Sequence, residues 1–388
     1  MASKWVDTTV GDFCPFTYGT GLPERARNSA GTVPVFGSNG VVGTHDSPYV
    51  NEPGIVIGRK GTVGAVHYSP NPFWPIDTTF YVTSAGARDL RFTYYLLLSL
   101  PLDQMNADSA VPGLNRDAAH SVRIRVPSLE GQRRIADVLG KLDDKIELNR
   151  RMNRTLEKMA AAIFKSWFID FDPVHAKAQG RDPNLPPEIA DLFPDSFEES
   201  ELGAIPAGWK PGSLGDVADS PRRGVKPSDV PPTTPYIGLE HMPRRCIALD
   251  AWGRAEDVAS GKSQFKEGEI LFGKLRPYFH KVGIAPVDGV CSTDIVVVTP
   301  KAVHWHSYVA SLVSSKAFVD YTDSHSAGTK MPRTNWKDMG RYPLALPPEP
   351  LAKAFQDHVA ALHKRIGVNV RQNRRLAGLR DTLLPKLL

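Results

Sequence analysis

The most constraining feature of this chain is an internal repeat at a constant offset of 220 residues, the difference between Asn335 and Asn115. Residues 115–164 align with residues 335–384 without a gap. The identical pairs include Pro127 and Pro347, Leu142 and Leu362, Ile146 and Ile366, Asn149 and Asn369, Asn153 and Asn373, and Leu156 and Leu376. A repeated sequence folds as repeated structural units. We therefore expect two similar modules, each with a globular part followed by a long helix.

Both globular parts are predicted to be rich in β-strands. Short β-branched runs alternate with turns that contain glycine, proline or asparagine, as at residues 80–83 and 294–298. Between the halves, proline-rich residues 171–208 are predicted to be a connector. The expected fold is α+β with a pseudo-twofold internal repeat. Its predicted parts are β-rich domains at 1–128 and 209–348, and long helices at 129–170 and 349–388.

Apolar residues spaced alternately by three and four positions predict that both helices contribute to a coiled-coil seam. The seam positions are Leu139, Leu142, Ile146, Asn149, Asn153, Leu156 and Ile163 in the first helix, and Val359, Leu362, Ile366, Asn369, Asn373, Leu376 and Leu383 in the second. Seam asparagines reduce stability but fix the register of the partners. Placing Asn149 opposite Asn373 also places Asn153 opposite Asn369, which favours an antiparallel pair. A parallel homodimer of the first helix would align its asparagines equally well.

The composition excludes several classes of protein. With 41% hydrophobic and 23% charged residues, the chain has an ordinary globular composition rather than that of a disordered or fibrous protein. Cys14, Cys246 and Cys291 have neither disulfide-framework nor metal-site spacing, and no signal peptide or membrane-spanning stretch is visible. A cytoplasmic protein is therefore expected. The net charge of +5 permits a polyanionic partner without requiring one.

Several motifs together resemble the specificity subunit of Type I restriction-modification systems, over nearly the whole chain. Residues 127–164, which begin Pro-Ser-Leu-Glu-Gly-Gln-Arg-Arg, resemble that family's central helical region. Residues 205–216 resemble the start of its second target recognition domain. Four segments resemble recurrent loops of the same family: residues 34–40, 58–64, 271–278 and 328–333.

The resemblance implies a division of labour. Each recognition domain would read one half of a bipartite site in double-stranded DNA, and the helices would set the spacing and dock two modification (methyltransferase) subunits. Those subunits would carry S-adenosylmethionine and methylate adenine, and motor-nuclease restriction subunits could join them in host defence. This chain would hold no cofactor or metal and would not be catalytic by itself. The second helix departs from the first, because Leu351–Ala354 stands where the first has Gly131–Arg134.

Candidate DNA contacts lie mainly in basic, glycine-containing loops of both halves. They are Ser38, Asn39, Arg59, Lys60, Thr62, Asn115 and Arg116 in the first half, and Lys274, Arg276, Tyr278, His280, Lys281, Thr329, Lys330 and Arg333 in the second. Cations neutralise phosphates, and Arg276 could alternatively read a guanine edge. The alternatives are solvated turns for the basic loops and helix capping for Asn115. A nucleotide-binding loop at residues 58–64 is not favoured, because a predicted strand follows it rather than a helix.

Two other classes of function are alternatives. A non-DNA scaffold, with two β-rich modules on a coiled coil, would bring proteins together. A self-contained nuclease or methyltransferase would need catalytic motifs, and none is visible in the sequence. Asp143 and Asp144 are expected to lie on a solvated helix face. Asp77 and Asp294 are expected to set a turn or to orient a basic side chain.

Overall fold

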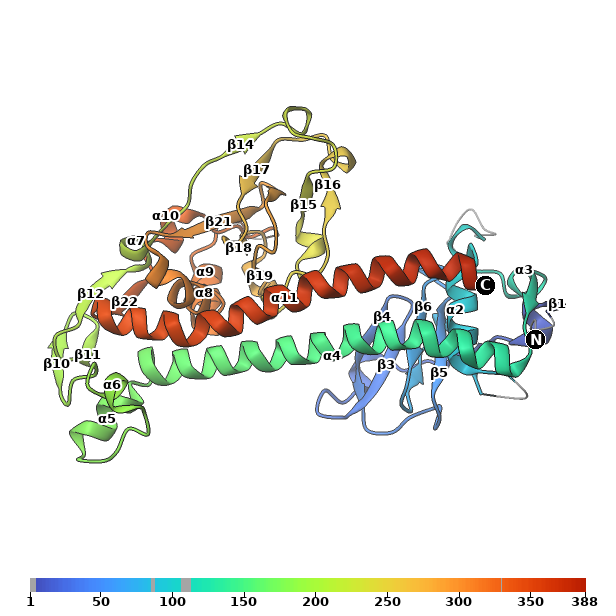
Figure 1. The fold of residues 1–388 in the computed structure, drawn as a ribbon, viewed down its shortest axis with the longest axis horizontal. Helices are drawn as coiled ribbons and strands as arrows, with labels where there is room; N and C mark the ends of the chain where they lie inside the picture. Colours follow the sequence, from blue (N-terminus) through green and yellow to red (C-terminus); the bar gives the residue numbers. More distant parts are fainter. Residues whose placement is uncertain (1–4, 85–87, 106–112, 329) are drawn as a thin grey trace. The chain divides into compact units, whose positions relative to one another are not determined.

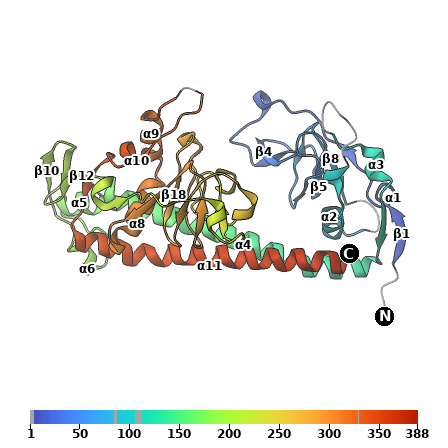
Figure 2. The same cartoon turned by 90° about the horizontal axis from the view of Figure 1, so that it is seen from above.

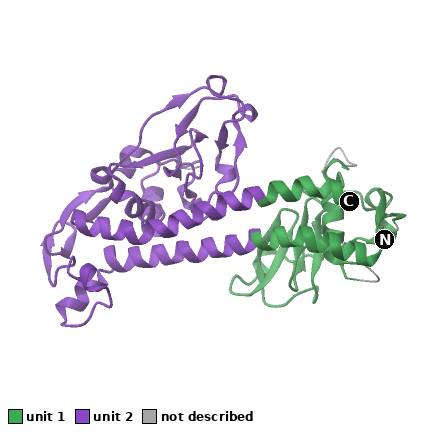
Figure 3. Ribbon diagram, in the orientation of Figure 1, with its two compact units in different colours: residues 1–145, 376–388 green, residues 146–375 purple. Residues whose placement is uncertain are grey.

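The computed structural model describes residues 5–84, 88–105, 113–328 and 330–388. It divides into two compact units, Met1–Lys145 with Leu376–Leu388 (unit 1) and Ile146–Arg375 (unit 2), which Figure 3 distinguishes by colour. Each unit contains a globular part and a segment of both long helices, α4 (Leu129–Phe168) and α11 (Glu349–Leu387) (Figure 1).

Unit 1 is built on small, mainly antiparallel sheets. The central sheet has the order β2 (Thr17–Tyr18), β8 (Thr79–Thr83), β5 (Gly54–Gly58) and β6 (Val66–Ser69). A second sheet places β3 (Val33–Gly37) between antiparallel β4 (Gly40–His45) and parallel β7 (Trp74–Pro75). The first strand, β1 (Val6–Thr9), pairs antiparallel with β9 (Arg123–Val126), which brings the two ends of the globular part together.

The core of unit 1 forms around β5, the strand whose residues are all buried. Ile55 and Ile57 pack with Phe80 of β8 and with Phe92 and Leu96 of helix α2 (Leu90–Ser99). The short helices α1 (Val10–Phe13) and α3 (Arg116–His120) complete this part of the unit. The sheet and helix α2 therefore support the loops that follow β5.

Unit 2 repeats the plan of unit 1. Its corresponding sheet has the order β13 (Ala218–Asp219), β21 (Ile295–Pro300), β18 (Ile270–Gly273) and β19 (Val282–Ile284). Outer strands β12 (Lys210–Ser213) and β22 (Pro343–Leu346) pair antiparallel as β1 and β9 do. The second sheet again contains one parallel pair, in the order β14 (Gly224–Val225), β17 (Lys262–Phe265), β20 (Gly289–Cys291), β15 (Pro235–Ile237) and β16 (Gly253–Arg254). The predicted α+β fold and internal repeat are confirmed.

Short helices and the unit 2 segments of α4 and α11 close the core of unit 2. The short helices are α7 (Leu214–Val217), α8 (His306–Val313), α9 (Lys316–Ser324) and α10 (Trp336–Met339). Phe164 and Trp167 of α4 and Phe355 of α11 belong to the same buried cluster as Ile270 and Phe272 of β18. In Figure 2 the sheet that contains β18 lies on one side of these helix segments. The helices are thus part of the domain core as well as a pair with each other.

The proline-rich connector is more ordered than its composition indicated. Its longest element is the seven-residue helix α5 (Asp172–Ala178), in agreement with the prediction that no long helix or strand forms there. The rest folds into helix α6 (Pro187–Ala190) and a hairpin of β10 (Phe197–Ser200) and β11 (Gly203–Pro206). Val174, Ile189 and Phe193 are buried in the core of unit 2. The apolar residues between the prolines therefore anchor the segment, which is not a free linker.

Within unit 2, the predicted asparagine pairs meet. The Nδ2 of Asn149 donates to Oδ1 of Asn373 at 2.8 Å, and the Nδ2 of Asn369 donates to Oδ1 of Asn153 at 2.8 Å. All four side chains are buried. These bonds agree with the predicted antiparallel register in this unit. The seam as a whole, which continues through residues of both units, stays a prediction.

Within unit 1, the expectation of a solvated helix face holds for Asp144, whose side chain is 65% exposed, and is wrong for Asp143, whose side chain is 21% exposed. Asp143 accepts hydrogen bonds from Arg380 at 2.8 Å and from the hydroxyl of Tyr95 at 2.6 Å. Asp144 accepts two from Arg91. Arg380 of α11 is thus paired with a carboxylate within unit 1. None of the helices in the described ranges is long and apolar enough to cross a membrane.

Candidate nucleic-acid interface

In unit 1, two of the predicted arginines converge on one aromatic ring. The guanidinium carbons of Arg59 and Arg116 lie 5.3 and 5.1 Å from the ring centre of Tyr18. Tyr18 lies on edge strand β2 and is 47% exposed. Arg59 follows β5 directly, and its Nη2 also donates to the carbonyl of Asp77 at 3.0 Å. Cation–π contacts of this kind orient a guanidinium group and leave donors available for a phosphate or a base.

The loop after Arg59 adds smaller groups to this surface. Lys60 and Thr62 are exposed, and the turn between β5 and β6 uses left-handed glycines at Gly61 (φ +80°) and Gly64 (φ +74°). Strand β6, and not a helix, follows this loop, as predicted. A nucleotide-binding loop therefore stays disfavoured. A cation and a hydroxyl thus lie close to Arg59 on a tight turn.

Unit 2 has an equivalent arrangement around Phe279. The guanidinium carbons of Arg244 and Arg276 lie 4.1 and 5.8 Å from the centre of this ring. Phe279 is the last residue of the one-turn 3-10 helix η6 (Pro277–Phe279), and Tyr278 of the same turn is 50% exposed. Arg276 has a left-handed backbone (φ +51°), and its N–H donates to the carbonyl of Pro332 at 2.7 Å. The backbone and the ring together fix where this guanidinium group lies.

The segment that follows α9 supports the same surface. The Nη2 of Arg276 donates to the carbonyl of Lys330 at 3.4 Å, and the Nε of Arg333 donates to Oδ1 of Asp294 at 3.1 Å. The expectation that Asp294 orients a basic side chain is therefore confirmed, whereas Asp77 contacts Arg59 through its carbonyl only. Thr329 lies outside the described residues. Lys330 is exposed beside this pair.

A groove of about 720 Å³ in unit 2 extends the basic surface. It is lined by Lys274, Arg222, Lys226 and Trp336. Among the described residues that line it, Asp229 is the one that is acidic. The sequence motifs did not include Arg222 and Lys226, which lie in the segment before β15. Tyr18, Arg244 and Phe279 were also missed, because their roles depend on contacts between residues far apart in the sequence.

Comparison with known proteins agrees with this geometry. Residues 2–158 match the family described as the Type I restriction modification DNA specificity domain. The chain is 26% identical to the Type I restriction enzyme HindI specificity subunit of Haemophilus influenzae, over 81% of this chain and 80% of that protein. Over most of its length, the chain is similar to the specificity subunits of Type I restriction-modification systems.

Other specificity subunits have a similar degree of identity to this chain. The MjaIX specificity subunit of Methanocaldococcus jannaschii is 25% identical over 87% of this chain and 79% of that protein. The crystal structure of a Type I S subunit from M. genitalium has a TM-score of 0.59 with 15% identity. That alignment covers 100% of this chain and 96% of the other, and it shows a shared fold.

Two of the predicted contact residues of this chain have clear structural roles. Ser38 is 7% exposed, and its hydroxyl donates to the carbonyl of Thr78 at 2.7 Å. Asn115 is the N-cap of α3, and its Oδ1 accepts from the backbone N–H groups of Asp117 and Ala118 at 2.9 Å. The capping alternative therefore explains Asn115, and Asn335 caps α10 in the same way. Asn39 remains exposed at the tip of the β3–β4 turn.

Two basic residues of the second loop are also used within the protein. The ring of His280 contacts the carbonyl of Ser314 through Nε2 at 2.8 Å, and burial lowers its pKa. The Nζ of Lys281 donates to the carbonyl of Leu239, and burial lowers the pKa of this amine. Both side chains are thereby held against backbone carbonyls of unit 2. The candidate surface of unit 2 therefore centres on Arg276, Arg244 and Arg333 rather than on these two residues.

Proposed function

We propose that this chain is the sequence-specific DNA-binding subunit of a Type I restriction-modification complex. Each globular domain would read one half of a bipartite site in double-stranded DNA. The observation that carries the proposal is the recurrence of an aromatic ring with two arginines, Tyr18 with Arg59 and Arg116, and Phe279 with Arg244 and Arg276. Arginine is the side chain best suited to bidentate contacts with guanine and with phosphates.

We further propose that the long helices set the half-site spacing and dock two methyltransferase subunits. S-adenosylmethionine would bind to those subunits and not to this chain, which would contribute no catalysis itself. Motor-nuclease subunits could complete a restriction complex. A chain that works on cellular DNA in this way would act in the cytoplasm. Similarity to Type I specificity subunits supports these assignments.

The test of this function is a methylome comparison. We expect cells with the gene to methylate adenine within one bipartite motif, and cells without it to lose that methylation while keeping all other modified motifs. An unchanged methylome in a host that expresses the partner methyltransferase would contradict the proposal. Restoring the gene on a plasmid is the control for effects on neighbouring genes.

Salt dependence separates this function from the protein-scaffold alternative. When a protein neutralises several phosphates, the cations condensed on the DNA are released into solution. This release becomes less favourable as the salt concentration rises, so the affinity for DNA falls. We expect the assembled complex to bind duplex DNA with a steep negative slope of log K against log salt. A scaffold would bind its protein partners with no measurable affinity for duplex DNA at moderate salt.

A further inference from the structure

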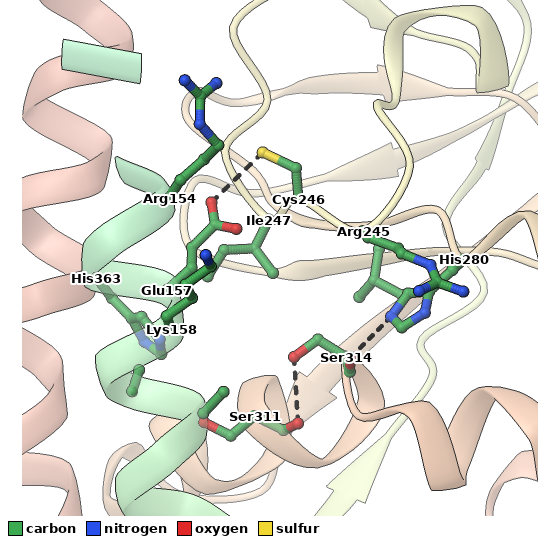
Figure 4. Close-up of a pocket in the computed structure, with 13 residues that line it drawn as sticks. Arg154, Glu157, Lys158, Arg245, Cys246, Ile247, His280, Ser311, Ser314 and His363 are labelled. Atoms are coloured by element: carbon green, nitrogen blue, oxygen red, sulfur yellow. Dashed lines mark hydrogen bonds between the residues drawn. The ribbon is translucent and has the colours of Figure 1, made fainter. Parts of the chain in front are cut away.

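Unit 2 contains a cavity of about 290 Å³ between its helix segments and its globular part (Figure 4). One wall is formed by Glu157 and Lys158 of α4 and His363 of α11. The opposite wall includes Arg245, in the loop between β15 and β16, and Ser311 of α8. A volume of this size would hold about ten water molecules, or a small organic molecule with a similar number of non-hydrogen atoms.

Two buried polar atoms at this cavity have no hydrogen-bond partner within the described ranges. They are the Oγ of Ser311, whose side chain is 8% exposed, and the Nδ1 of His363. Buried polar atoms are normally hydrogen-bonded, because leaving one unpaired costs about 1–3 kcal/mol. Ser311 of α8 and His363 of α11 both line this cavity. They are therefore suited to bind one ligand from both sides.

The charged side chains around the cavity are mostly cationic. Arg154, Lys158 and Arg245 line it, and Glu157 is the one carboxylate among its lining residues in the described structure. The Oε1 of Glu157 already accepts from the backbone N–H of Ala248 at 3.2 Å and from the thiol of Cys246 at 3.4 Å. Arg154 is paired with Glu147 at 3.0 Å, whereas Lys158 and Arg245 have no acidic partner among the ion pairs of the described chain. The cavity therefore favours a negatively charged occupant.

The backbone at the mouth of the cavity is held in an unusual conformation. Arg245 (φ 54°) and His280 (φ 51°) are non-glycine residues in the left-handed region, and the N–H of Arg245 donates to the carbonyl of His280 at 2.8 Å. Residues in this region carry a conformational cost and tend to occur at functional sites. This conformation brings the Arg245 side chain to the cavity.

We propose that this cavity is a binding site for a small organic anion. Its phosphate or carboxylate group would accept hydrogen bonds from Ser311 and from the Nδ1–H tautomer of His363, with Lys158 and Arg245 supplying the balancing charge. Hydrogen bonds to an ionised acceptor are roughly twice as strong as those between neutral groups. Because the walls belong to both helices and to the globular part, an occupant would stabilise unit 2 by mass action. This role is separate from DNA recognition.

The experiment measures the melting temperature and the binding isotherm of the full chain. The probes are inorganic phosphate and succinate, each compared with chloride at matched ionic strength. We expect at least one probe to raise the melting temperature, and Arg245→Gln and Ser311→Ala each to weaken its binding about tenfold or more. Ser311→Ala should not lower the melting temperature without the probe, because it removes an unpaired buried hydroxyl.

The controls distinguish this cavity from other cationic surfaces. Arg375→Gln, at an exposed position of α11 that does not line the cavity, should leave binding unchanged. Arg333→Ala, at the proposed DNA surface, should do the same. A response to phosphate alone would identify a phosphorylated ligand, and a response to succinate alone a carboxylate. The proposal is overturned if neither probe binds, or if binding survives both cavity substitutions.

Discussion

Arg276 is the residue whose position is most tightly restrained on the proposed DNA surface of unit 2. Its left-handed backbone, the ring of Phe279 and the carbonyl of Lys330 hold it, and its side chain is partly exposed. We expect Arg276→Ala to weaken specific DNA binding by the assembled complex by about 1–3 kcal/mol, the range of one good base contact. Fluorescence anisotropy with target and non-target duplexes measures this change.

The matched control for Arg276→Ala is Arg341→Ala, at an exposed position in the same unit. Neither substitution should lower the melting temperature of the chain by more than a small amount, since exposed side chains contribute little to stability. Equal loss of affinity in both variants would indicate a general effect of charge. Unchanged affinity in Arg276→Ala at moderate salt would remove this residue from the interface.

A second prediction at this scale concerns His363. Burial lowers its pKa to about 4, below the value of about 6.5 expected for the unfolded chain. The unfolded state therefore binds a proton first as pH falls, and stability is lost between about pH 6.5 and pH 4. We expect this residue to cost about 2 kcal/mol at pH 5 relative to pH 7.5. Denaturant unfolding at both pH values, compared with His363→Gln, measures it.

The carboxylates of the chain also titrate toward acid pH, so the comparison rests on the difference between the two proteins. His363→Gln removes the protonation of this one group and should flatten the pH dependence by the stated amount. Identical pH profiles for the parent and the variant would contradict a buried, neutral His363.

At the scale of elements, the asparagine pair of unit 2 ties α4 to α11. Asn149→Leu would leave Oδ1 of Asn373 and Oε1 of Gln372 without the donor that both now share. We expect this variant to lose about 1–3 kcal/mol of stability, the cost of an unpaired buried polar group. The double variant Asn149→Leu/Asn373→Leu should recover most of the loss, because neither buried amide remains.

A double-mutant cycle in urea denaturation isolates this interaction. Arg375→Leu, at an exposed position of α11, is the control for adding an apolar residue to the helix. A double variant that is less stable than either single variant would show that the two asparagines contribute independently. The hydrogen bond between them would then not be the reason for their position.

The proline-rich segment gives a second prediction for an element. Phe193 is 2% exposed, and its ring packs at right angles to that of Trp167 with the centroids 5.3 Å apart. Phe193→Ala should destabilise the chain by about 3–5 kcal/mol, as expected for a large core residue. Thermal or denaturant unfolding measures the change, with exposed Glu188→Ala as the control. A linker would tolerate both substitutions equally.

How well the sequence predicts a feature of this protein depends on how far apart in the chain the contacting residues lie. The repeat and the long helices rest on local patterns or on one fixed offset, so the sequence was sufficient to predict them. The antiparallel pairing of the asparagines in unit 2 and the capping role of Asn115 were each one of two alternatives, and the contacts in the structure decided between them. The partners of Asp143 and the packing of Phe193 depend on tertiary contacts that no local pattern encodes. The same holds for Phe279 and Arg244, which are 35 residues apart in the chain yet in contact.

At the scale of the whole molecule, duplication implies that the two recognition functions are separable. Each unit has its own hydrophobic core and its own arginines around an aromatic ring. We expect Arg59→Ala to relax the sequence preference of one half of the bipartite site and Arg276→Ala to relax the other half. Each change should leave the opposite half as strict as in the parent.

Selection of bound duplexes from a randomised library, with the assembled complex, measures this separation. Lys60→Ala is the comparison within unit 1: as a compact point charge suited to phosphates, Lys60 should affect affinity for all sequences and reduce the salt slope by about one. Relaxation of both halves by a single substitution would mean that the halves are read jointly. Relaxation of one half alone would tie each unit to its own part of the target, because the cores and arginine clusters that support the two surfaces are distinct.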